Sequence, residues 1–160
     1  FRSAMSRQRV ITKSLLLTAM LVGALMGAQV LPATATEPAC ALNGVQPVPV
    51  LETAKAHFLR GEYAQFYRIA TPFVSDAEAR YGEVMGQLPV LFQGGFTDCS
   101  TVLQRREAGG MVQEMTLFAV RPPGRGMMSL LLTSAPLGGE EKVIFMTFSS
   151  QMSRVMEELH

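Results

Sequence analysis

The residues of this chain that could act as an acid–base pair are His57 and Asp98. The chain has two histidines, and the other is the terminal His160. A histidine works as a general base when a carboxylate orients it beside a pocket. Each residue also has a simpler interpretation, because a helical histidine is commonly structural and an aspartate before a strand commonly forms a turn. We therefore treat the two as weak catalytic candidates.

Two cysteines, Cys40 and Cys99, could form a disulfide or a redox pair. The chain contains no C-x-x-C motif, and an exported protein with two cysteines normally joins them. We predict a structural disulfide that closes a loop of about 60 residues. In the loop-entropy model such a bond stabilises the fold by about 3–4 kcal/mol.

Methionine is the residue that suggests a metal site, because the chain has 11 of them and thioethers bind Cu(I). Met111 and Met115 would share a strand face. No histidine accompanies them in the sequence, and methionine is also ordinary core filler. We expect no metal and no cofactor. Nucleophile elbows of the G-x-S-x-G type and phosphate-binding glycine loops are both missing from the sequence.

The first 35 residues have the pattern of an export signal. A basic stretch precedes an apolar run at 14–28, and Ala33-Thr34-Ala35 supplies a signal-peptidase site. We predict cleavage after Ala35 and a periplasmic or secreted protein; an uncleaved membrane anchor is the alternative. The resulting division is a signal peptide with upstream residues at 1–35, a linker at 36–49 and a single α+β domain at 50–160.

Charge argues against a nucleic-acid partner. Four basic residues precede residue 36, so cleavage changes the formal net charge from +1 to −3, with 10 basic and 13 acidic residues left. We expect no nucleic-acid binding and no membrane association after cleavage. Four arginines of the sheet are either solvated strand ends or a small basic rim at one end of it: Arg105, Arg106, Arg121 and Arg125.

The region 98–150 predicts a four-stranded antiparallel meander. Glycine- and proline-rich turns separate segments of strand-forming residues, and the connections are too short for parallel crossovers. The predicted strands are 99–107, 111–121, 127–135 and 142–150.

The faces of these strands follow from alternation. Neither face of the segment 111–121 is cleanly polar, so we expect cover on both sides. The segment 99–107 ends in charged residues, which suits an edge strand. The last strand presents one apolar row, formed by Ile144, Met146 and Phe148.

Helices are predicted before the sheet and after it. Helical spacing begins near Val50, and Gly61 indicates a kink or two short helices. A further helix starts at Ser75-Asp76-Ala77-Glu78, which matches a capping box. The segment 151–159 predicts a short terminal helix with one apolar face, formed by Met152, Val155, Met156 and Leu159.

The stretch Phe58-Leu59-Arg60-Gly61-Glu62-Tyr63-Ala64-Gln65-Phe66-Tyr67 is similar to the helix, x-G-D/E-Y/F, helix opening of small exported domains in the nuclear-transport-factor-like (cystatin-like) superfamily of α+β cones. The resemblance covers roughly 50–150. It implies an α+β fold with N-terminal helices packed on a curved four-stranded antiparallel meander. Members include enzymes, ligand-binding domains and scaffolds, so this fold does not by itself determine a function.

We expect a small, exported, non-enzymatic domain that binds a hydrophobic small molecule or a protein partner in the concavity between sheet and helices. Two alternatives stay open. One is an enzyme with an acid–base pair inside the cone, and the other is a module that forms homodimers through an exposed apolar patch. The residues expected to line the concavity, or simply to fill the core, are Phe58, Tyr67, Phe92, Leu117, Phe118 and Phe145.

Overall fold

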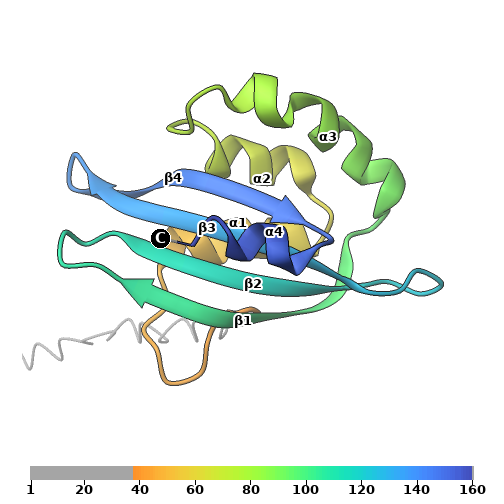
Figure 1. The fold of residues 1–160 in the computed structure, drawn as a ribbon, viewed down its shortest axis with the longest axis horizontal. Coiled ribbons are helices and arrows are strands. Elements are labelled where there is room, and N and C mark those ends of the chain that lie inside the picture. Colours follow the sequence, from red (N-terminus) through yellow and green to blue (C-terminus); the bar gives the residue numbers. More distant parts are fainter. Residues whose placement is uncertain (1–37, 160) are drawn as a thin grey trace, which may run out of the picture. The chain divides into compact units, whose positions relative to one another are not determined.

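The computed structural model describes residues 38–159 and orders them as an α+β fold (Figure 1). These residues belong to a compact unit that spans 35–160. The predicted signal peptide and its cleavage site lie outside the described residues. The helices and strands are α1 (Pro49–Leu59), α2 (Tyr63–Ala70), α3 (Ala77–Leu91), β1 (Phe96–Arg106), β2 (Val112–Val120), β3 (Met127–Leu137), β4 (Glu140–Ser149) and α4 (Met152–Met156).

The four strands form one antiparallel sheet in the order β1-β2-β3-β4, which confirms the predicted meander. As predicted, β1 is an edge strand. Arg106 pairs with Val112 at one end of the sheet, and Phe96 pairs with Val120 at the other. The arginines at 105–106 and those at 121–125 therefore lie at opposite ends, and the alternative of a single basic rim is wrong.

The register of the sheet shifts at three places, at Thr97, Val102 and Ile144, and the last two matter for which residues share a face. In β1 the register shifts between Thr101 and Leu103, which leaves Val102 as the extra residue. In β4 the extra residue is Ile144, because Thr133 pairs with Phe145 and Ser134 pairs with Val143. A bulge inserts one residue and exchanges the faces beyond it. Val143, rather than Ile144, therefore joins Met146 in the main core, which corrects the predicted apolar row.

Gly61 divides the first helical segment into α1 and α2. Of the two predicted alternatives, a kink or two short helices, the second is confirmed. Its φ is +73°, a left-handed conformation that disfavours other residues. A Cβ at this position would lie 2.5 Å from the backbone nitrogen of Gly95. The helix–helix turn thus packs directly on the backbone that leads into β1.

The start of α3 differs from the predicted capping box. Asp76 is the N-cap residue, it has a left-handed φ of +53°, and no side-chain hydrogen bond caps the helix. The Glu78 carboxylate instead accepts a hydrogen bond from the Tyr67 hydroxyl. Tertiary contact with α2 has replaced the local bond that the sequence pattern favours.

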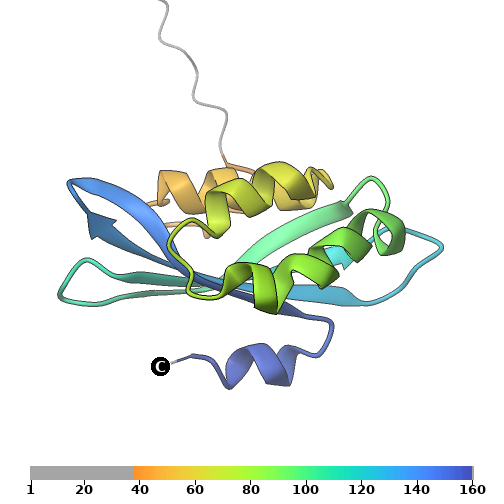
Figure 2. The same cartoon turned by 90° about the horizontal axis from the view of Figure 1, so that it is seen from above.

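Helices cover both faces of the sheet. Figure 2 shows α1, α2 and α3 on one face and α4 on the other. The first face contains the main core, centred on Phe58, whose ring lies 4.8 Å from that of Phe66 and 5.0 Å from that of Phe118. On the second face Val155 packs with Met115 and Leu131. The prediction of cover on both faces is confirmed.

The terminal helix is shorter and less buried than its predicted apolar face implies. Val155 is buried and Leu159 packs against the same cluster, but Met152 and Met156 are exposed. The apolar outer face expected for a dimer interface is thus partly covered by the chain's own α4.

The predicted Cys40–Cys99 disulfide is confirmed, with 5.1 Å between the two Cα atoms. The Thr101 N–H also donates to the Cys40 carbonyl, at 3.1 Å. We call residues 40–48 the strap, because they are held along β1 before α1 begins. Its far end is anchored at the Gln46 carbonyl, which accepts hydrogen bonds from Gln104 and Arg106.

Candidate functional site

An open, mainly apolar groove lies between α2 and α3. Its volume is about 290 Å³. We call it the helix groove, and its lining residues are Tyr63, Ala64, Tyr67, Glu78, Gly82, Met85, Gly86 and Pro89.

Small residues of α3 keep the helix groove open. Gly82 and Gly86 are four residues apart and so lie on one face of the helix. A Cβ at Gly86 would have no atom within 4 Å, and one at Gly82 would meet only the flexible Glu78 side chain. Packing therefore does not require glycine at either position, although each glycine destabilises a helix interior by about 1 kcal/mol relative to alanine.

Two tyrosines give the helix groove its polar groups. The Tyr67 hydroxyl donates to Glu78 Oε2 at 3.0 Å, and burial together with that carboxylate raises the pKa of Tyr67. The Tyr63 hydroxyl donates to the Phe92 carbonyl at 2.8 Å, and burial raises its pKa to about 12. Both hydroxyls therefore stay protonated at neutral pH, and the Glu78 carboxylate is the acceptor at the groove wall.

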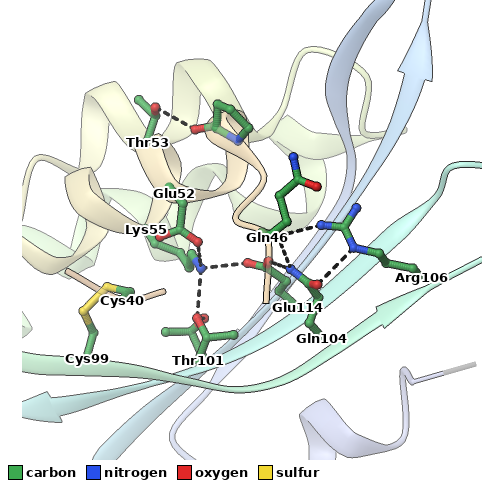
Figure 3. Close-up of polar contacts among 12 residues, drawn as sticks. Cys40, Gln46, Glu52, Thr53, Lys55, Cys99, Thr101, Gln104, Arg106 and Glu114 are labelled. Atoms are coloured by element: carbon green, nitrogen blue, oxygen red, sulfur yellow. Dashed lines mark hydrogen bonds and ion pairs between the residues drawn. A yellow bond between two sulfur atoms is a disulfide. The ribbon is translucent and has the colours of Figure 1, made fainter. Parts of the chain in front are cut away.

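A second polar group, a buried charge cluster, lies between α1 and the sheet (Figure 3). Lys55 is 1% exposed, and its Nζ atom lies 2.7 Å from Glu114 Oε2 and 2.9 Å from Thr101 Oγ1. Lys55 Nζ also donates to Glu52 Oε1. Burial is the main cause that raises the pKa of Glu52, against the opposing effect of Lys55.

The bulge at Val102 makes this cluster possible. Without the extra residue, Thr101 and Gln104 would point to opposite faces of β1. With it, the Thr101 hydroxyl oxygen accepts a hydrogen bond from Lys55 Nζ, while Gln104 Nε2 donates to Glu114 Oε1 at 2.6 Å. Gln104 also donates to the Gln46 carbonyl, so the strap covers the cluster from outside. The cluster has the ingredients of acid–base chemistry, but it does not line the helix groove.

His57 and Asp98 are not brought together. His57 Nδ1 lies 2.5 Å from Glu62 Oε2, and Arg60 lies beside both. Asp98 Oδ1 accepts a hydrogen bond from the adjacent Cys99 N–H, at 2.8 Å. Within residues 38–159 no hydrogen bond or ion pair joins the two candidates.

The six residues expected to line a concavity are distributed over several sites. Phe58 and Phe118 are fully buried in the main core, and Phe92 stacks on Phe96 at 5.2 Å between ring centroids. The concavity between sheet and helices is therefore filled by the protein's own rings.

The other three expected residues lie elsewhere. Phe145 packs against Met115 on the opposite face of the sheet. Leu117, two residues from Met115 on β2, points to that same face. Tyr67 lines the helix groove.

Sequence reasoning missed the residues of the charge cluster and, apart from Tyr67, those of the helix groove. The sequence did contain a signal for the charge cluster, namely charged residues at positions that the apolar pattern assigns to the core. Lys55 lies four residues after Leu51 on the apolar stripe of a helix, and Glu114 lies two residues after Val112 in a strand. For the helix groove the signal was the pair Gly82 and Gly86 inside a helical pattern.

Comparison with known proteins finds no match for the chain. No protein-family model matches it, and searches of curated proteins and of solved structures find no match. The structure supports the predicted fold class, an α+β arrangement of N-terminal helices on a four-stranded antiparallel sheet.

Two further findings concern the described residues alone. No group of three or more His, Cys, Asp or Glu side chains in 38–159 is arranged to hold a metal ion. No helix in this range is long and apolar enough to cross a membrane.

Proposed function

We propose that this protein is a non-enzymatic binding domain that holds a small apolar molecule with one hydrogen-bond donor in the helix groove. The observation that carries the proposal is the pair of glycines, Gly82 and Gly86. Both glycines make α3 less stable than alanine would, and the packing around them does not require glycine. Their lack of a side chain keeps the hollow open.

The size and chemistry of the helix groove favour a small ligand. Its volume of about 290 Å³ is at the lower end of ligand pockets, which start at about 300 Å³. Tyr63, Met85 and Pro89 provide apolar walls. Glu78 accepts one hydrogen bond from Tyr67 and has acceptor capacity left for a ligand's N–H or O–H group.

A binding role fits this chemistry better than catalysis. The tyrosines of the helix groove have raised pKa values and hold protons instead of exchanging them at neutral pH. The charge cluster of Lys55, Glu52 and Glu114 is buried under the strap, where its charges bind one another.

We also propose export and a cone-like ancestry for the domain. The Cys40–Cys99 disulfide favours an oxidising compartment, in agreement with the signal pattern at 1–35. The helix–turn–helix opening at Gly61 and the meander that follows support the resemblance to the nuclear-transport-factor-like superfamily.

Binding can be tested with N-phenylnaphthylamine, a neutral apolar dye whose fluorescence rises in apolar surroundings and whose N–H suits Glu78. Residues 36–160 are titrated with dye as wild type and as Gly86→Leu. We expect the leucine to fill the helix groove and to weaken binding at least tenfold. The melting temperature should stay equal or rise, because leucine is a better helix former than glycine.

The matched control is Gln87→Leu, which adds the same side chain to an exposed neighbouring position of α3 outside the helix groove. It should bind the dye as the wild type does. Equal affinities for wild type and Gly86→Leu, or no dye binding by the wild type, would overturn the proposal.

A further inference from the structure

Apolar side chains project from one end of the molecule. Val90 is 82% exposed and Leu91 is 62% exposed at the end of α3, and Met127 is 53% exposed at the start of β3. Exposure this high means that the side chains protrude into solvent. Large apolar residues in such positions are expected where a surface meets another apolar phase.

The end of α3 and the β2–β3 loop lie side by side at this end of the sheet, as both views show (Figures 1 and 2). Together they line a hollow of about 370 Å³ that includes Val90, Leu91, Pro122 and Pro123. Arg121 Nε donates to the Gly94 carbonyl at 3.1 Å and ties the loop to the helix end. Val90 and Leu91 therefore form one surface with the loop, whereas Met127 precedes the core residue Met128 and lies on the opposite face of the sheet.

The charge of this surface is opposite to that of the chain after residue 35. Segments 84–97 and 117–139 contain no acidic residue, and their charged residues are Arg121 and Arg125. The rest of the unit is acidic, since residues 36–160 have a formal net charge of −3. We name the four residues of this surface the tip patch: Val90, Leu91, Arg121 and Arg125.

We propose that the tip patch docks onto an anionic phospholipid surface, with Val90 and Leu91 entering the headgroup region and the two arginines pairing with lipid phosphates. Protruding apolar residues next to cations are the combination that interfacial binding requires. The two arginines outnumber the one carboxylate at this end of β1, that of Asp98, which pairs with Ala119. This inference goes beyond ligand binding in the helix groove, and it departs from the sequence-based expectation that no membrane association follows cleavage.

Vesicle co-sedimentation tests the proposal directly. Residues 36–160 are mixed with vesicles of pure phosphatidylcholine or of phosphatidylcholine with 30% phosphatidylglycerol. We expect binding to the anionic vesicles only, weakened by added salt. Arg125→Gln should weaken it about five-fold, since a surface cation contributes about that factor. Val90→Ser/Leu91→Ser should weaken it at least ten-fold.

Two controls match these variants. Phe73→Ser removes an exposed apolar side chain between α2 and α3, at the other end of α3, and Arg154→Gln removes an exposed cation on α4. Both should bind as the wild type does. The proposal is overturned if the wild type ignores anionic vesicles, if it binds both lipid mixtures equally, or if the controls weaken binding as much as the tip variants. Circular dichroism confirms that each variant is folded.

Discussion

Glu52, Lys55 and Glu114 put one cation between two carboxylates in the interior of the domain. If both carboxylates were ionised, the cluster would carry a net negative charge, which a buried site strongly disfavours. Glu52 Oε2 has no hydrogen-bond partner among the described residues, and burial raises the pKa of this carboxyl. This burial shifts Glu52 toward its neutral form, and the neutral form lowers the net negative charge of the cluster.

The substitution Glu52→Gln tests this shift through its pH dependence. Because the folded pKa lies above the ordinary 4.5, the contribution of Glu52 to the free energy of unfolding is present below pH 4.5. That contribution is lost as the pH rises through the folded pKa. Glutamine mimics the protonated form, so the stability of the variant relative to wild type should grow with pH above 4.5 and stay constant below it. Urea denaturation at a series of pH values measures this, and a pH-independent difference would contradict it.

Loss of the central cation should be much more harmful. Lys55→Met leaves two buried carboxylates without their partner, and we expect the free energy of unfolding to fall by about 3–5 kcal/mol. Lys55→Met/Glu114→Gln should lose less than the single variant, because one stranded charge is removed. The control is Lys142→Met, which breaks a half-exposed ion pair with Glu140 and should lose less than about 1 kcal/mol. Urea unfolding that gives Lys55→Met a loss as small as that of the control would refute the charge-cluster account.

At the scale of elements, the strap and β1 are coupled by the disulfide and by backbone hydrogen bonds. Cys40 and Cys99 are 59 residues apart in sequence, and the loop they close includes all of α1, α2 and α3. The bond therefore restrains most of the helical half in the unfolded chain.

Cys40→Ala/Cys99→Ala should lower the free energy of unfolding by about 3–4 kcal/mol in the loop-entropy model. Urea denaturation of oxidised wild type and of the variant gives this difference. Amide exchange provides a second measurement, since the Thr101 N–H bonds to the Cys40 carbonyl and should exchange faster when the strap is released. A loss below about 1 kcal/mol would show that the strap is held by its other contacts.

Elements were predictable where local chemistry decides them. Glycine and proline turns gave the strands within a few residues, and Gly61 marked the break between α1 and α2. The bulges at Val102 and Ile144 were not predictable, because one inserted residue leaves the apolar composition of a strand unchanged. The capping box at Ser75 failed because the Tyr67–Glu78 contact, which joins two helices, is invisible in a local pattern.

At the scale of the whole molecule, the fold class follows from the sequence but the site does not. The order of helices, meander and terminal helix could be predicted from periodicity and turns. The location of the helix groove depends on how α2 and α3 pack beside each other, because α2 contributes Ala64 and α3 contributes Gly82 to its lining. Aromatic residues are the usual signal for a pocket, yet here Phe58 and Phe118 fill the core and small residues shape the hollow.

The measurement that tests the central claim most directly is a nitrogen–proton NMR titration of residues 36–160 with N-phenylnaphthylamine. The amides of Ala64, Gly82 and Gly86 report from the walls of the helix groove. The account predicts saturable shifts that concentrate on these amides and disappear in Gly86→Leu. Shifts that concentrate instead on the sheet or on α4, or that persist in Gly86→Leu, would contradict it.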